Sequence, residues 1–273
     1  MVDSMNKTES LSSTPWWVVT DLDGTLMDHA YNWAPAREAI RGLQMQGIPV
    51  IPCTSKTAEE VKSFRAAAGL KDPFIVENGG AVHGETSDGE SWELALGCPI
   101  AELRPVLREL AELLSEPLQP IDALSDQEAF DLLGLQGEAL QLACTRRWSL
   151  PFVPPSASAR QRLPDLANRL GFAVVQGNRM SHLLGAEVSK GRALEVLKQH
   201  RGGAPVRVLA LGDSPNDEPL LEAGDLSVVV PGSNGPHPVF ADAIAQGRYQ
   251  LAQACHAQGW AQAVFQYVLN ESC

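Results

Sequence analysis

Asp21 and Asp23 have the residue type and spacing that most clearly suggest chemistry, because two carboxylates stand two positions apart directly after the apolar run Trp16–Thr20. Carboxylates this close repel each other, which predicts a neighbouring cation, and Mg²⁺ with its oxygen ligands suits phosphate chemistry. Asp21 can attack phosphorus and form an aspartyl-phosphate, while Asp23 can protonate the leaving oxygen and later deprotonate water. Gly24 lets the chain turn where a side chain would obstruct a phosphate. The alternative is an acidic turn that caps the next helix.

Two hydroxyls and a lysine in distant segments can complete an anion site. Thr54 and Ser55 follow the apolar segment 48–53, and hydroxyl and backbone N–H groups at a helix N-terminus bind phosphate oxygens. Taken alone, both residues are also typical N-caps. Lys190 begins a helical pattern, where a cation opposes the helix dipole, and this unfavourable position indicates that it meets an anion. The alternative is a solvated surface lysine.

A second acidic loop follows another apolar run. Asp213 and Asp217 lie in the segment 212–217, directly after the predicted strand 206–211. Asp213 can ligate the metal, and Asp217 can hold a metal-bound water or orient Lys190. A helix cap is again the alternative, and Pro215 suits the first turn of a helix. The two acidic loops together are far more specific than either one alone.

The elements that must position these loops alternate between strand and helix. Predicted strands cover 16–20, 48–53, 73–76, 206–211 and 226–230, and predicted helices cover 34–46, 58–68 and 215–223. Such alternation is typical of an α/β fold, a parallel sheet with helices on both faces. Ligands of these sheets bind beyond the carboxyl ends of the strands. The polar loops after Thr20, Cys53 and Leu211 are therefore expected to form one site.

The pattern changes in the middle of the chain, which predicts an inserted α/β unit. Helices are expected over 100–114, from a capping box at Ser125, over 138–146 and over 159–170, with strands over 172–175 and 180–184. The predicted organisation is a disordered leader at 1–14, a core domain of 15–82 and 185–273, and a cap domain of 83–184. An insertion at this point is well placed to cover the site.

Composition excludes several classes of function. The chain has 273 residues and a formal net charge of −12, which disfavours binding to nucleic acids and anionic membranes, although a small cationic pocket remains compatible. The five cysteines form no metal-binding or disulfide pattern, which fits a reducing compartment. Neither a secretory signal nor a membrane-spanning run is evident in the sequence. A cytoplasmic protein is expected, and the sequence leaves monomer and homodimer open.

These motifs, in this order, resemble those of the haloacid dehalogenase superfamily. The matching residues are Asp21-x-Asp23-Gly24-Thr25, Thr54, Lys190 and Gly212-Asp213-x-x-Asn216-Asp217. The resemblance implies a Rossmann-like core, an α/β cap of the C2B type, and an aspartyl-phosphate intermediate. It also implies Mg²⁺ held by Asp21, the backbone carbonyl of Asp23 and Asp213, with Asp217 in support. The dehalogenases of this superfamily lack the second aspartate, so Asp23 indicates phosphoryl transfer.

Further segments resemble the mannosyl-3-phosphoglycerate phosphatase family. They are Thr20–His29, the Tyr31/Trp33 pair, Cys53–Thr57, Arg147–Phe152 and Gly177–Leu183, although Trp148 and Leu150 depart from the family's usual pattern. The resemblance implies hydrolysis of a mannosyl- or glucosyl-3-phosphoglycerate to the glycosylglycerate, a product like a compatible solute. It places the following residues at the substrate: Ser55, Lys56, Arg147, Arg179, His182 and Asn216. In this interpretation Arg147 and Arg179 clamp the glycerate carboxylate, and His182 bonds a hydroxyl.

Other interpretations remain open. The same motifs fit a phosphatase of another sugar phosphate, such as sucrose phosphate, and a phosphomutase. A non-catalytic sensor of sugar phosphates on the same fold is an alternative from a different class. Since every motif position carries a residue able to do the chemistry, the enzyme interpretations are favoured.

Overall fold

A parallel five-stranded sheet forms the centre of the molecule. A computed structural model of the chain describes residues 14–270, so the expected leader at 1–14 lies almost wholly outside the described residues. The strand order is β11-β10-β9-β1-β2. The bounds are β1 Trp16–Thr20, β2 Val50–Pro52, β9 Arg207–Gly212, β10 Leu226–Val229 and β11 Gln250–Leu251. Every pairing in this sheet is parallel, which confirms the predicted α/β fold.

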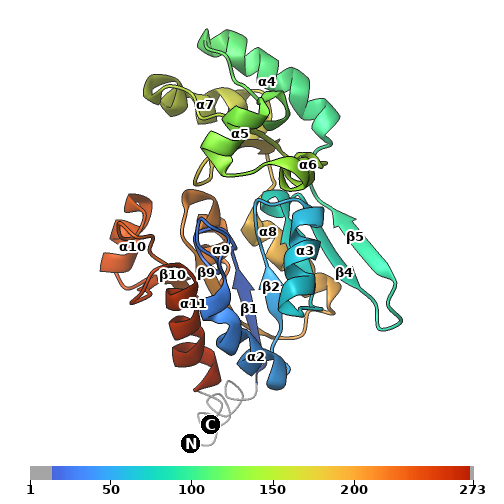
Figure 1. The fold of residues 1–273 in the computed structure, drawn as a ribbon, viewed down its shortest axis with the longest axis vertical. Coiled ribbons are helices and arrows are strands. Elements are labelled where there is room, and N and C mark those ends of the chain that lie inside the picture. The colour runs from blue at the N-terminus through green and yellow to red at the C-terminus, as the bar shows by residue number, and fades with distance from the viewer. Residues whose placement is uncertain (1–13, 271–273) are drawn as a thin grey trace, which may run out of the picture.

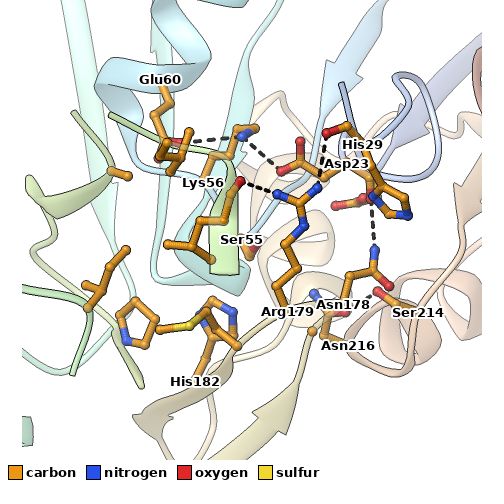
Figure 2. A pocket seen from close by; sticks show the side chains of 18 of the residues that line it. Asp23, His29, Ser55, Lys56, Glu60, Asn178, Arg179, His182, Ser214 and Asn216 are labelled. Carbon is orange, nitrogen blue, oxygen red and sulfur yellow. Dashed lines mark hydrogen bonds and ion pairs between the residues drawn. The ribbon is translucent and has the colours of Figure 1, made fainter. Parts of the chain in front are cut away.

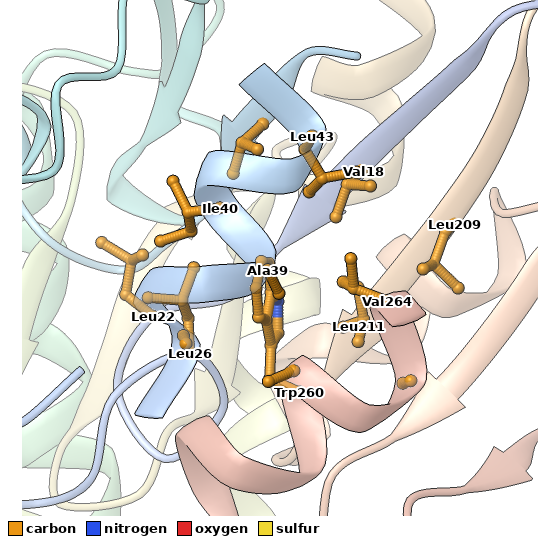
Figure 3. Close-up of a cluster of buried hydrophobic side chains, with 14 of the residues drawn as sticks. Val18, Leu22, Leu26, Ala39, Ile40, Leu43, Leu209, Leu211, Trp260 and Val264 are labelled. Carbon is orange, nitrogen blue, oxygen red and sulfur yellow. The ribbon is translucent and has the colours of Figure 1, made fainter. Parts of the chain in front are cut away.

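The alternation of side chains along β1 buries both faces of the sheet. Trp16 and Val18 pack with the helices of one face, and Trp17 and Val19 pack with those of the other. The first face is covered by α2 (Arg37–Met45) and α11 (His256–Val264), shown with their side chains in Figure 3. The second face is covered by α8 (Lys190–His200) and α9 (Glu218–Glu222). Burial on both faces explains why β1 is a continuous apolar run.

A second sheet, β3-β4-β5, extends the core beside α3 (Ala58–Ala68) (Figure 1). Its strands are β3 Phe74–Val76, β4 Ala81–Glu85 and β5 Ser91–Ala95, and they pair antiparallel. The sequence interpretation missed the β4–β5 hairpin. Val82 and Trp92 of this hairpin pack in the same cluster as Val19 of the central sheet. A domain boundary at residue 83 stays a prediction, and the hairpin's apolar contacts are with the core.

The inserted segment lies above the carboxyl ends of the central strands (Figure 1). Its helices are α4 Ile100–Leu114, α5 Asp126–Leu133, α6 Gly137–Cys144 and α7 Ala157–Arg169. Its antiparallel sheet has the order β6-β8-β7, with bounds β6 Leu150–Phe152, β7 Phe172–Gln176 and β8 Ser181–Gly185. The helix α4 packs with α7 and this sheet in a separate apolar cluster. We refer to residues 98–185 as the cap.

One buried carboxylate fixes the path of the chain between core and cap. Glu77, in a short helical turn after β3, accepts hydrogen bonds from the backbone N–H groups of Arg147, Trp148 and Ser149 at 3.0, 3.0 and 2.8 Å. It also accepts one from the Ser149 hydroxyl at 2.7 Å. This network anchors the segment that leads into β6. Among the helices of residues 14–270, none has the length and apolar character needed to cross a bilayer.

Candidate active site

The loop after β1 presents the first two carboxylates at the top of the sheet. The Asp21 N–H donates to the Leu211 carbonyl of the neighbouring strand at 2.9 Å, which continues the sheet pairing by one residue. Trp260 of α11 donates to the Thr20 hydroxyl at 2.9 Å and so fixes this end of β1. At Gly24, φ is +93° and a Cβ atom would lie 2.4 Å from Oδ2 of Asp213. Glycine is therefore required where the two acidic loops meet.

Lys190 is buried completely and forms ion pairs with two aspartates. Its Nζ atom lies 2.6 Å from Oδ1 of Asp21 and 2.5 Å from Oδ1 of Asp217. Burial alone would lower the pKa of Lys190, but the two carboxylates hold it above its usual value. Burial raises the pKa of Asp21 well above its usual range, with Asp217 and Asp213 adding to the rise against the opposing effect of Lys190. The sequence alternative of a solvated lysine is wrong for Lys190, which has no exposed surface.

The second acidic loop brings Asp213 and Asp217 to the same place. Both carboxylate oxygens of Asp217 have partners. Its Oδ1 atom pairs with Lys190, and its Oδ2 atom accepts hydrogen bonds from the N–H groups of Asp213 and Ser214 at 2.9 and 3.0 Å. Asp213 accepts hydrogen bonds from Thr25 at 2.7 Å and from Asn178 of the cap at 2.9 Å. Burial, followed by the charge of Asp217, raises the pKa of Asp213 to about 7. The carboxyl groups thus lie in an environment that disfavours several uncompensated negative charges.

The donor set fits a hard divalent cation. Carboxylate oxygens of Asp21, Asp213 and Asp217 all lie within 4.8 Å of one another. Ligands of this kind, all oxygen and mostly anionic, are those that Mg²⁺ prefers. The backbone carbonyl of Asp23 points to the same place, because Asn178 donates to it as well as to Asp213. Since Lys190 and two backbone N–H groups already engage Asp217, this residue is better suited to orienting the site than to direct ligation.

A cavity of about 100 Å³ lies between the core and the cap (Figure 2). Asp21 lines it, and we refer to the Asp21 side of the cavity as its floor. The core contributes a polar wall and the cap a largely apolar one, built by Ile121, Leu133, Leu135, Ala143, Pro151 and Met180. Most of the sequence-predicted residues line this cavity, namely Asp21, Asp23, Ser55, Lys56, Arg179, His182 and Asn216. One cavity therefore combines residues from four distant segments of the chain.

Asp23 and Lys56 form an ion pair within the cavity. Nζ of Lys56 lies 2.9 Å from Oδ2 of Asp23 and 3.4 Å from Oε1 of Glu60, and it stacks over the ring of Tyr31 at 4.5 Å. Burial alone would lower the pKa of Lys56, but Asp23 and Glu60 raise it above its usual value. The other oxygen of Asp23, Oδ1, is buried and has no hydrogen-bond partner among residues 14–270. Such an atom is available to a ligand.

Thr54 and Asn216 are held in place by their own networks. The Thr54 hydroxyl is buried and accepts the N–H of Lys56 at 3.2 Å, so it orders the loop whose next residue, Ser55, lines the cavity. The actual N-cap of α3 is Thr57, which forms a capping box with Glu60. The N-cap alternative for Thr54 and Ser55 is therefore wrong. Asn216 is held separately, since its side chain donates to the Asn78 side chain at 2.9 Å.

The cap contributes Arg179 and His182 to the cavity. Arg179 donates to the carbonyl oxygens of His29 at 3.0 Å and of Leu133, which links the β7–β8 loop to both the core and α5. His182 is 5% exposed, and its Nδ1 atom has no partner within the described residues. Burial lowers its pKa to about 3. His182 is therefore a neutral hydrogen-bonding group at every physiological pH.

Arg147 does not reach the cavity, and this corrects the sequence prediction. Its Nη1 atom lies 2.6 Å from Oε2 of Glu93 in the hairpin, and its side chain is 60% exposed in a separate groove. Because its N–H is bonded to Glu77, the backbone directs this side chain towards the hairpin. The preceding residue, Arg146, lines the cavity and donates to the Ser55 carbonyl at 2.8 Å.

The sequence interpretation missed Arg146, Asn178 and Tyr31 as cavity residues. Arg146 and Arg147 are adjacent identical residues, so no pattern separated them. Asn178 falls between the predicted strands 172–175 and 180–184, where a turn is expected, and it does lie between β7 and β8. Tyr31 has φ of +62°, a conformation that a bulky residue rarely adopts and that a sequence pattern does not reveal.

Comparisons with known proteins agree with this fold. The family model of haloacid dehalogenase-like hydrolases matches residues 18–95 and 155–246. A glucosyl-3-phosphoglycerate/mannosyl-3-phosphoglycerate phosphatase from Persephonella marina is 28% identical over 270 residues, covering 93% of this chain and 97% of that protein.

Solved structures show the same fold at low sequence identity. A haloacid dehalogenase-like hydrolase from B. subtilis has a TM-score of 0.67 at 17% identity, covering 92% of this chain and 99% of that one. A sucrose-phosphatase from Synechocystis, solved with sucrose and phosphate, has a TM-score of 0.60 at 17% identity, covering 93% and 98%. Both resemblances extend across the core and the cap.

Proposed function

The chain belongs to the haloacid dehalogenase-like hydrolases and is a phosphoric monoester hydrolase, and we propose that it is a magnesium-dependent phosphatase acting on a glycosyl-3-phosphoglycerate. The proposed products are the glycosylglycerate and phosphate, and the proposed intermediate is an aspartyl-phosphate at Asp21. The nearly full-length similarity to the Persephonella marina enzyme supports this substrate class.

The observation that carries the proposal is a cavity that brings Asp21 together with three cationic side chains. Lys56, Arg146 and Arg179 all line the cavity whose floor is Asp21. A glycosyl-3-phosphoglycerate carries two anionic groups, a phosphate and a carboxylate, so it needs more positive charge than a hexose phosphate does. An arginine can bind a carboxylate with two parallel hydrogen bonds. We assign the carboxylate to Arg146 and Arg179, in place of the Arg147 expected from the sequence.

In the first step, a carboxylate oxygen of Asp21 attacks phosphorus, and the bond between phosphorus and the glycerate oxygen breaks. Asp23, which takes up a proton as the substrate binds, gives it to that leaving oxygen, so that the glycosylglycerate departs as an alcohol. Lys190, pinned between Asp21 and Asp217, holds the nucleophile in one orientation and offers positive charge to the transferring group.

In the second step, water attacks the phosphorus of the aspartyl-phosphate. Asp23, now ionised, takes a proton from this water, and the bond between phosphorus and the Asp21 oxygen breaks. Phosphate leaves, and both carboxyl groups return to their initial states. Lys56 keeps Asp23 directed into the cavity through their 2.9 Å ion pair.

Asp21, the carbonyl of Asp23 and Asp213 would hold Mg²⁺, with Asp217 in support through Lys190 and the 213–214 backbone. When bound, the cation supplies charge neutralisation to the phosphoryl oxygens. The Asp21 and Asp213 carboxylates would then serve as ligands, and their mutual repulsion would be offset.

A substrate panel with two arginine variants tests the substrate class. Phosphate release would be measured with Mg²⁺ on mannosyl- and glucosyl-3-phosphoglycerate, sucrose phosphate, simple hexose phosphates and p-nitrophenyl phosphate. We expect kcat/KM to be at least about 100-fold higher for a glycosyl-3-phosphoglycerate than for substrates that lack the carboxylate. We expect Arg146→Met to remove most of this preference and to leave p-nitrophenyl phosphate hydrolysis nearly unchanged.

Arg147→Met is the matched control, because the adjacent arginine faces the hairpin groove. Its substrate preference is expected to stay within about twofold of the wild type. Equal loss in both variants would contradict the assignment of the carboxylate to Arg146. A wild-type enzyme that prefers sucrose phosphate or a hexose phosphate would contradict the proposed substrate, though not the phosphatase chemistry.

A further inference from the structure

A single side chain from the cap bridges the two acidic loops of the core. Asn178 lies in the loop between β7 and β8, and its Nδ2 atom donates to the carbonyl oxygen of Asp23 at 3.1 Å and to Oδ2 of Asp213 at 2.9 Å. Figure 2 shows Asn178 facing the Asp23 segment from the cap side. Among the described residues, no other cap side chain donates a hydrogen bond to both acidic loops.

These two oxygens are the ones that the proposed cation needs. A cation bound by the Asp23 carbonyl and the Asp213 carboxylate has to lie between them, and Nδ2 of Asn178 already lies within hydrogen-bond distance of both. The amide also turns its positively polarised N–H groups towards this point, which disfavours a cation there. The contact with Asn178 and the cation are therefore alternatives for the same pair of oxygens.

We propose that Asn178 competes with the divalent cation, so that cation binding releases the β7–β8 loop of the cap from the core. This inference rests on the cation site assigned under the proposed function. By thermodynamic linkage, a cation that breaks this contact binds more weakly for as long as the contact exists. Asn178 thereby sets the affinity of the site for its cation.

The competition between Asn178 and the cation has a functional consequence because the cavity is small. At about 100 Å³ the cavity is smaller than the roughly 300 Å³ at the lower end of ordinary ligand pockets, so a substrate with a sugar and a phosphoglycerate requires the cap to move. The cap loop contacts the core through Asn178 and through Arg179, which donates to the His29 carbonyl. Loss of the Asn178 contact removes the two bonds to the acidic loops and favours opening once the cation is present.

Calorimetric titration of the full-length protein with Mg²⁺, without substrate, tests the competition. We expect Asn178→Ala to bind Mg²⁺ about three- to tenfold more tightly than the wild type, because the cation no longer displaces the two hydrogen bonds that Asn178 donates. The matched control is Asn168→Ala, the same substitution at an exposed position of α7 in the cap. It should bind Mg²⁺ as the wild type does.

Hydrogen exchange supplies a second readout. We expect Mg²⁺ to speed amide exchange in residues 177–180 of the wild type, because the loop opens more often. Unchanged or weaker Mg²⁺ binding by Asn178→Ala, or slower exchange of the loop with Mg²⁺, would overturn the proposal.

The Asp213→Asn variant separates failure of the cation site from failure of the competition. If the wild type binds no Mg²⁺, or Asp213→Asn binds it equally well, the cation site itself is wrong. If only the Asn178 effect is missing, the competition alone fails.

Discussion

Asp21→Asn is expected to lower phosphate release by at least about 10⁴-fold, with substrate binding largely retained. The amide has nearly the shape of the carboxylate but lacks a nucleophilic anionic oxygen, so no aspartyl-phosphate can form. The measurement is kcat for phosphate release under saturating substrate and Mg²⁺. Lys190 keeps its ion pair with Asp217 in this variant, so a neutral amide at this position costs the fold little, and an unchanged thermal unfolding midpoint would show that the loss is chemical.

Asp88→Asn is the control for this variant, because Asp88 is exposed in the turn between β4 and β5. It should release phosphate at the wild-type rate. An Asp21→Asn protein that keeps even a hundredth of the wild-type rate, free of deamidated material, would exclude Asp21 as the nucleophile.

Lys190→Met is expected to cost about 3–5 kcal/mol of unfolding free energy and at least about 100-fold in kcat. Methionine fills a similar volume to lysine, but the variant leaves Asp21 and Asp217 buried without the positive charge that pairs with both in the wild type. The loss of activity follows because the nucleophile loses its orienting contact and the phosphoryl group loses a positive charge. Urea denaturation measures the first effect and phosphate release the second.

Lys198→Met in the same helix provides a comparison. Lys198 pairs with Glu195 at 2.7 Å on the surface of α8, and such exposed pairs contribute about 0–1 kcal/mol. If Lys190→Met were as stable as Lys198→Met, the buried ion-pair network would not have the importance assigned to it.

Local patterns were sufficient to predict the floor of the site. The segments after β1 and β9 carry carboxylates directly behind apolar runs, and the geometry of parallel sheets requires such loops to meet at one edge. The structure brings Asp21, Asp213 and Asp217 within 4.8 Å of one another, as that argument expected. The convergence depends on sheet topology, which the alternation of strands and helices indicates well.

The walls of the cavity were harder to predict, because they depend on single hydrogen bonds between distant segments. Whether Arg146 or Arg147 faces the cavity is decided by Glu77, which lies 70 residues from Arg147 and binds its N–H. Nothing in the local sequence specifies that contact. The bridge from Asn178 to Asp213 is equally non-local, and a residue that follows a glycine between two strands is first interpreted as a turn.

The β4–β5 hairpin escaped prediction for a different reason. Its strands contain polar and small residues, and none of the five β5 positions from Ser91 to Ala95 is fully buried. A strand at the edge of a sheet needs little apolar character, so periodicity gave a weak signal. The hairpin matters to the site because Glu93 pairs with Arg147 and holds it away from the cavity.

The most direct test of the central claim, that Asp21 becomes phosphorylated and Asp23 then activates water, is a burst experiment on Asp23→Asn with p-nitrophenyl phosphate and Mg²⁺. Nitrophenolate leaves without needing a proton, so the first step survives in this variant, while hydrolysis of the intermediate lacks its base. The account predicts release of about one nitrophenolate per protein chain followed by near arrest, with phosphate recovered on the peptide that contains Asp21. Steady turnover without a burst, or phosphate on another residue, would contradict it.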